Sequence, residues 1–151
     1  MSSPNLLGST TATQIGIVVS DIEATSKAWA QILGIPAPPI METDGYDKAR
    51  TEFQGEPSAA RAKLAFLSLG SLTLELIEPI GEPSTWNRQL QLHGPSLHHI
   101  AFETKDMNAS LQALQNAGIA LEQKGEYTGG RYAYVDARQQ LGTIIELLEN
   151  D

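Results

Sequence analysis

The chain contains an internal repeat, and this repeat constrains the fold more than any other feature of the sequence. Residues 13–35 are similar to residues 98–119, because each segment is a short β-rich run followed by an Asp, an amphipathic helical stretch and a Gly-Ile exit. A second pair of similar segments, 69–79 and 141–150, closes the two halves. Two copies are too few to stack as a solenoid. The repeat therefore predicts two halves related by a pseudo-twofold axis.

Each half is predicted to contain one strand, one helix and then three strands. Asp21 and Asp106 precede the helical stretches, where a side-chain oxygen caps free amides, and Gly34 and Gly118 follow where helices end. We therefore expect an α+β fold of two βαβββ modules whose sheets face a shared central space.

The division of the chain follows the repeat. Residues 40–62 are rich in Gly, Pro, Ala and charge, and we interpret them as a loop or an irregular strand. We expect a flexible N-terminal tail at 1–12 and a single domain at 13–150, made of module 1 at 13–80, a linker helix at 81–96 and module 2 at 97–150.

The charge balance restricts the possible partners. The 151 residues include 18 acidic and 10 basic side chains, which gives a net charge of -8. Nucleic acids and anionic membrane surfaces bind clustered Lys and Arg, so we expect neither as a partner. The absence of cysteine excludes a thiolate metal site or a cysteine nucleophile. No signal peptide or membrane span is evident, so we expect a cytoplasmic protein.

Four polar residues lie at matching positions of the two halves. Gln14 and His99 each stand one residue before an apolar run, and Glu75 and Glu146 each interrupt an apolar strand. A carboxylate on a buried strand face is costly unless it is paired or bound to a metal. These residues suit one divalent ion per chain, which could be Zn, Co, Ni, Mn or Mg. Strand alternation turns His98 away from His99, which predicts a structural role for His98.

Three segments make the sequence similar to the vicinal oxygen chelate superfamily. They are LHHIAFET (97–104), GTIIELLE (142–149) and KLAFLSLGSLTLELIEPIGEPSTW (63–86), the last of which resembles the methylmalonyl-CoA epimerase branch. The superfamily also includes glyoxalase I, extradiol dioxygenases and metal-free bleomycin-binding proteins. The resemblance implies a cup of mixed sheet around one metal, with Gln14, Glu75, His99 and Glu146 as its ligands.

The chain departs from individual branches at a few positions. Epimerases usually have His where Gln14 stands, whereas a Gln, Glu, His, Glu set is similar to that of eukaryotic glyoxalase I. Two residues that hold glutathione in that family are replaced here by Pro79 and Pro95. The second acid-base Glu of the epimerases falls near Ala59 or Ala60.

The resemblance implies a metal-dependent isomerase, epimerase or lyase. It would transfer a proton alpha to a carbonyl of a small acid, thioester or hydroxycarbonyl substrate. Glu146 is the candidate base, and Glu75 is a candidate to return the proton. Alternatives are a glyoxalase I-like lactoylglutathione lyase and a metal-free drug-binding resistance protein.

The remaining expectations concern substrate contacts and assembly. Arg131, in a Gly-rich turn, is the first candidate to bind an anionic substrate, with Lys124 and Arg50 as weaker ones, and Tyr134 could line the cup. We expect a homodimer, because the open edges of two sheets tend to be paired or covered.

Overall fold

The computed structural model describes residues 4–151; residues 1–3 of the predicted tail lie outside the described part. Module 1 holds β1 (Ala12–Val18), α1 (Ile22–Leu33), β2 (Met41–Glu42), α2 (Tyr46–Ala49), β3 (Glu52–Phe53), β4 (Glu56–Pro57), β5 (Arg61–Ser68) and β6 (Thr73–Ile80). After α3 (Thr85–His93), module 2 holds β7 (Ser96–Glu103), α4 (Met107–Asn116), β8 (Leu121–Tyr127), β9 (Gly130–Ala137), α5 (Arg138–Leu141) and β10 (Thr143–Asn150).

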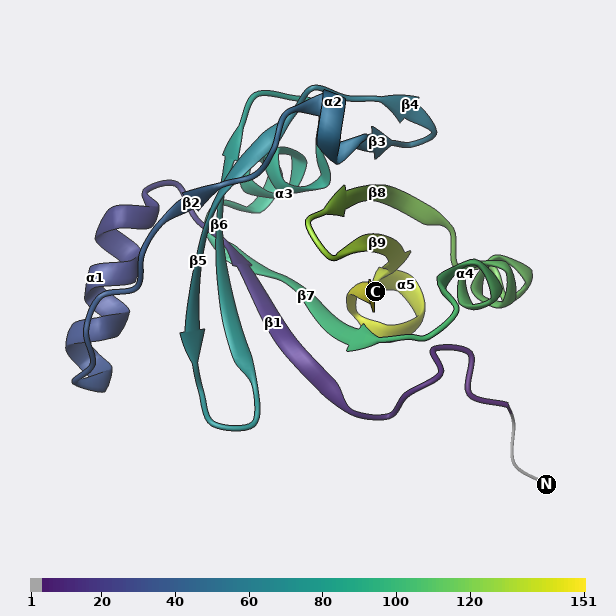
Figure 1. Ribbon diagram of the computed structural model, residues 1–151, viewed down its shortest axis with the longest axis horizontal. Helices are drawn as coiled ribbons and strands as arrows, with labels where there is room; N and C mark the ends of the chain where they lie inside the picture. Colours follow the sequence, from purple (N-terminus) through teal and green to yellow (C-terminus); the bar gives the residue numbers. More distant parts are fainter. Residues whose placement is uncertain (1–3) are drawn as a thin grey trace.

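The strands form one curled, mixed sheet in the order β2-β5-β6-β1-β7-β10-β9-β8-β3-β4 (Figure 1). The pairs β1–β6 and β7–β10 are parallel, and the other neighbours are antiparallel. The two modules meet where β1 pairs with β7 at the centre of the sheet. The expected α+β fold of two pseudosymmetric modules is confirmed.

The two halves share the same strand register. Gln14 of β1 stands opposite Thr73 of β6, two residues before Glu75. His99 of β7 stands opposite Ile144 of β10, two residues before Glu146. The register therefore makes Gln14 equivalent to His99 and Glu75 equivalent to Glu146.

Each central strand carries a β-bulge immediately before this polar position. The β1–β7 register shifts between Ala12 and Gln14, where Thr13 is the extra residue. It shifts again between Gly16 and Ile17, and there the extra residue is His98 on β7. A bulge interrupts the alternation of side chains and redirects them. This matters for the site, because His98 no longer points away from its neighbour.

Helices α1 and α4 cover the outer side of the sheet (Figure 1). The side chains of Asp21 and Asp106 accept hydrogen bonds from Ala24 N and Ala109 N at 3.1 Å, so both predicted N-caps are present. Figure 1 shows α1 beside β5 and β6, and α4 beside the curl of module 2. Their apolar faces complete two core clusters, and Leu6 of the predicted tail packs against the one under α4.

The segment between α1 and β5 crosses from one module to the other. Its β3 strand pairs with β8 of module 2, while its β2 strand pairs with β5 of module 1. Figure 1 shows α2, β3 and β4 gathered above β8. The sequence predicted only a loop or irregular strand here. The strands are two residues long, too short for a recognisable period.

Candidate metal centre

The inner side of the curled sheet encloses a cavity of about 600 Å³. Its wall is drawn from both modules, since Gln14 and Glu75 come from β1 and β6 while Glu146 comes from β10. Tyr132 and Tyr134 of β9 form part of the same wall. The cavity is thus the shared central space that the repeat predicts.

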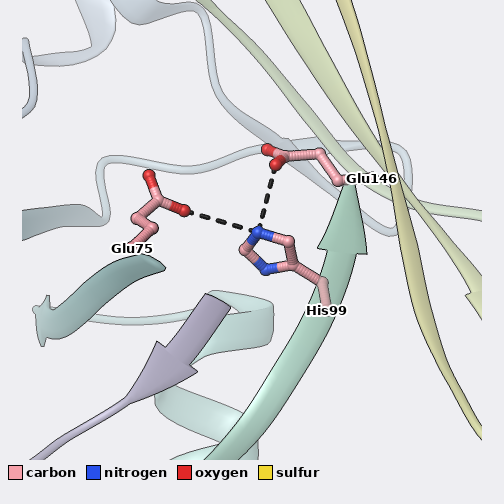
Figure 2. Close-up of side chains that lie close together, drawn as sticks. All are labelled: Glu75, His99 and Glu146. Atoms are coloured by element: carbon pink, nitrogen blue, oxygen red, sulfur yellow. Dashed lines mark ion pairs between the residues drawn. The ribbon is translucent and has the colours of Figure 1, made fainter. Parts of the chain in front are cut away.

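Three buried ionisable side chains converge in this cavity. His99 Nε2 lies 3.1 Å from Glu146 Oε1 and 3.4 Å from Glu75 Oε1. Figure 2 shows the two carboxylates reaching the same ring nitrogen from β6 and β10. The ring of His99 is fully buried, and Glu75 and Glu146 are 8% and 4% exposed.

These three atoms have no hydrogen-bond partner with suitable geometry. His99 Nε2, Glu75 Oε1 and Glu146 Oε1 are all buried and unsatisfied, although they lie at ion-pair distances. Such groups are rare in folded proteins, because each loses its bonds to water. One potential ligand atom from each residue lies within 4.8 Å of the others. Two carboxylates and an imidazole suit a divalent ion, so the donor set fits the metal that the resemblance implies.

Gly16 on the neighbouring strand makes room for His99. Gly16 stands opposite His99 in the β1–β7 ladder, and the imidazole lies over its backbone. A Cβ added at Gly16 would be 2.1 Å from His99 Cε1, closer than any real contact. A glycine at position 16 is therefore needed for the imidazole of His99 to occupy its place on the opposite strand.

The bulge brings His98 and His99 together. His98 Nδ1 lies 2.8 Å from His99 Nδ1, and His98 Nε2 lies 3.1 Å from Thr85 Oγ1 at the start of α3. If Nε2 of His99 is free to bind a metal, its proton sits on Nδ1 and is donated to His98. His98 then carries its own proton on Nε2 and donates it to Thr85. The prediction that His98 points away from His99 was wrong, because alternation fails at a bulge.

Burial and the carboxylates set the protonation of the metal-free site. Burial lowers the pKa of His99, but Glu146 and Glu75 outweigh this and raise it to about 9. Burial also raises the pKa of Glu146 above its ordinary value, although His99 opposes this. The pKa of His98 is well below its ordinary value because of burial and the nearby charge on His99. Of the two histidines, His99 is therefore the one that is protonated in the metal-free site. A metal must displace that proton to bind.

Comparison with known proteins agrees with this geometry. Residues 13–135 match the family model of the Glyoxalase/Bleomycin resistance protein/Dioxygenase superfamily. The chain belongs to this superfamily. It is 34% identical over 92 residues to the uncharacterized protein YqjC of Bacillus subtilis (strain 168), a match that covers 59% of this chain and 66% of YqjC, just under two thirds.

Two epimerases are also similar to this superfamily member. The ethylmalonyl-CoA/methylmalonyl-CoA epimerase of Cereibacter sphaeroides is 26% identical over 140 residues, which are 88% of this chain and 92% of that one. The crystal structure of methylmalonyl-CoA epimerase from Mycobacterium tuberculosis has a TM-score of 0.64 and 21% identity, and the match covers 100% of this chain and 93% of that one. At this identity the structural likeness shows a common fold.

The predicted site residues divide into two groups. Glu75, His99 and Glu146 form the buried cluster, and Gln14 lines the same cavity. Tyr134 also lines it, and its hydroxyl accepts a hydrogen bond of 3.1 Å from Trp86 Nε1.

The three predicted cations are placed elsewhere. Arg131 donates to Glu149 at 2.8 Å and to Asp151 at 2.7 Å, and Lys124 Nζ lies 3.9 Å from Glu52 Oε2. None of the three, Arg50 included, is part of the cavity wall. Their role in substrate binding stays a prediction that the geometry does not favour.

Reasoning from the sequence missed two residues that shape the site, Gly16 and Thr85. Gly16 lies on the inner face of β1 beside Gln14, and a glycine inside a strand is a known signal of close approach by another group. That signal could have indicated Gly16. The contact between Thr85 and His98 depends on how α3 packs, which no local pattern reveals.

Within residues 4–151, no helix combines the length and apolar character that a membrane span requires.

Proposed function

We propose that this protein is a metal-dependent enzyme that transfers a proton at the carbon next to a carbonyl group. Glu75, His99 and Glu146 would hold a divalent ion together with Gln14. The observation that carries the proposal is the convergence of three buried, unsatisfied ligand atoms in a cavity of about 600 Å³. Membership of the superfamily and the similarity to epimerases support it.

A bound divalent ion would act as a Lewis acid and stabilise negative charge that develops on a substrate oxygen. The protein's own contribution is to position the proton acceptor and to exclude water. Glu146 is the proposed acceptor, because it is almost fully buried and lines the cavity. A positioned carboxylate within reach of the substrate carbon can accept its proton.

Glu75 is the group that we propose returns the proton. It occupies the equivalent position on β6, and both carboxylates lie against the same nitrogen of His99 (Figure 2). Two carboxylates from opposite halves of a pseudosymmetric site can address different faces of one carbon. This arrangement favours an isomerase or epimerase, with a small acid, thioester or hydroxycarbonyl compound as substrate.

Exchange of substrate hydrogen with solvent deuterium tests this proposal. The metal-loaded protein is incubated in D₂O with acyl-CoA, 2-hydroxy acid and hydroxycarbonyl substrates, and mass spectrometry measures deuterium uptake. Glu146→Gln keeps an oxygen ligand but loses the base, so uptake should fall about 100- to 10,000-fold. Metal content should fall much less.

The control variant is Glu103→Gln, which removes a carboxylate from the cavity wall outside the buried cluster. Its uptake should stay well above that of Glu146→Gln. A wild-type protein that binds metal but incorporates no deuterium from any substrate class would contradict the proposal. A protein that binds neither metal nor proton-exchanging substrate would favour the metal-free binding alternative.

A further inference from the structure

The cavity wall has a strongly one-sided charge. Within residues 4–151, six carboxylates line the cavity and no Lys or Arg does. They are Glu42, Asp44, Glu75, Glu103, Glu126 and Glu146. A divalent ion on the buried cluster would balance two of these charges at most, so the wall around it stays negative.

Little else compensates the outer part of this wall. Glu42 has a cationic partner, since Arg61 Nη2 lies 3.0 Å from its Oε1. None of the ion pairs among the described residues involves Asp44, Glu103 or Glu126. Glu103 accepts one hydrogen bond, of 3.2 Å, from Asn150 Nδ2. Three exposed carboxylates therefore surround the approach to the buried cluster without a neutralising side chain.

Four cations of the chain are engaged in ion pairs outside the cavity. Arg131 is held between Glu149 and Asp151, and Lys124 lies beside Glu52. Arg88 and Arg138 both reach Glu122, which is not part of the wall. Among the described residues, no Lys or Arg of the wall is available to a phosphate or carboxylate inside the cavity.

A separate observation indicates that the cavity takes a ligand at all. Glu75 Oε1 and Glu146 Oε1 are buried, lack a hydrogen-bond partner and belong to residues that line the cavity. The wall also has an apolar part, made by Met41, Leu64 and Phe66. A divalent ion would satisfy the two carboxylate oxygens, and a ligand with an oxygen group directed toward the ion and an aliphatic tail would fit both parts of the wall.

We propose that the substrate is a hydroxycarbonyl compound without net negative charge, whose tail is neutral or cationic. This inference rests on the proposed function, in which Glu75, His99 and Glu146 would hold a divalent ion that stabilises negative charge on a substrate oxygen. It excludes the phosphate-bearing CoA thioesters and the anionic glutathione adducts as preferred ligands. Exposed carboxylates at the wall disfavour an anion by repulsion and concentrate a cation.

Three hydroxamates of similar length test this substrate class by binding alone. Butyrohydroxamate, β-alanine hydroxamate and succinic monohydroxamate share one oxygen-chelating group, and their tails are neutral, cationic and anionic. Calorimetry with the cobalt-loaded protein gives each dissociation constant at low and high salt. The cationic probe should bind about tenfold tighter than the anionic one at 20 mM salt, and the neutral probe should lie between them. This difference should shrink at 1 M salt, where screening acts within about 3 Å.

Charge variants locate the effect. The double variant Glu103→Gln/Glu126→Gln should reduce the preference for the cationic probe severalfold. Glu23→Gln, a change of the same kind on α1 and outside the cavity wall, should leave the preference unchanged. Equal effects of the two changes would show that net charge, and not the wall, sets the preference.

The two proposals can fail separately. An anionic probe that binds as tightly as the cationic one overturns the substrate class, even if an acyl-CoA substrate exchanges deuterium as the proposed function requires. A clear preference for the cationic probe without deuterium uptake from any hydroxycarbonyl substrate supports the substrate class and contradicts the proton transfer.

Discussion

The two halves of the sheet use the same backbone for different purposes. Gln14 and His99 occupy equivalent positions on β1 and β7, but their neighbours across the β1–β7 ladder differ. His99 stands opposite Gly16, whereas Gln14 stands opposite Ala101. The glycine leaves room for the imidazole of His99, whereas the equivalent position carries the methyl group of Ala101.

The difference shows that the two modules share a backbone arrangement, and that single residues give each module a different role in the site. Module 2 supplies the nitrogen ligand, and module 1 supplies the space which that ligand needs. Each half retains one carboxylate, Glu75 or Glu146, at the same register position. The two halves should therefore respond unequally to equivalent substitutions, and the following predictions measure that inequality.

Removal of the two equivalent side chains should show the largest difference. His99→Ala should lower the affinity for Co²⁺ by more than about 100-fold. Substitution of a residue that only contacts a metal ligand costs up to about 100-fold, and loss of the ligand itself should cost more. Gln14→Ala should lower the affinity for Co²⁺ by about tenfold, because Gln14 would be an uncharged metal ligand and its side chain is only partly buried. Competition with a chelating dye measures both. Equal losses in the two variants would break the comparison.

The pH dependence of metal binding should separate the halves as well, since only His99 of the equivalent pair can titrate. Its pKa is raised to about 9 in the metal-free protein, so a proton occupies the nitrogen that the metal needs. Below that pH the apparent affinity for Co²⁺ should rise about tenfold per pH unit, as one proton is released per ion bound. Calorimetry in buffers of different ionisation enthalpy counts the protons. A flat profile between pH 6 and pH 8 would contradict the assignment.

Exchange of the facing residues tests the space beside His99. Gly16→Ala should displace the imidazole, destabilise the fold by about 1–3 kcal/mol and lower metal affinity by roughly 10- to 100-fold. Ala101→Gly at the equivalent position should cost about 0.5–1 kcal/mol and leave metal affinity nearly unchanged. Urea unfolding and the dye competition give both quantities. A Gly16→Ala protein with normal metal affinity would show that His99 does not need this space.

The bulged residues should give the smallest of the four differences. His98→Leu removes the acceptor for His99 Nδ1, so metal affinity should fall about tenfold. His98→Asn offers an oxygen in place of Nδ1 and should recover part of the loss. Thr13→Val at the equivalent bulge should have little effect, because the hydroxyl of Thr13 only donates a 3.4 Å bond to the carbonyl of Ala101. Nitrogen-detected NMR reports the tautomer of His99 in each variant. It shows whether loss of the acceptor for His99 Nδ1 causes the loss of metal affinity.

Much of this site could be predicted from the sequence because its elements repeat. The Asp caps, the alternation within β6 and β10 and the two isolated Glu residues are local patterns, and the repeat then brings distant patterns to one place. Glu75 and Glu146 were found this way. The α+β fold followed from the same periodicities.

Other parts of the site depend on contacts that leave no local pattern. The bulge at His98 arises from how β7 pairs with β1, and simple alternation gave the wrong direction for its side chain. Arg131 follows a glycine-rich turn that suggested exposure near the site, but Glu149 and Asp151 at the end of β10 bind it. The crossing of β3 to β8 joins segments about 70 residues apart, which only the folded chain can show.

A crystal structure of the zinc-loaded protein, with anomalous data collected at the zinc edge, shows whether the buried cluster binds a metal. We expect one strong anomalous peak per chain, about 2.0–2.2 Å from atoms of Glu75, His99 and Glu146. We also expect that the peak disappears in His99→Ala crystals grown in the same way. An empty cluster in wild-type crystals, with zinc only at surface side chains, would contradict the assignment of this site as a metal centre.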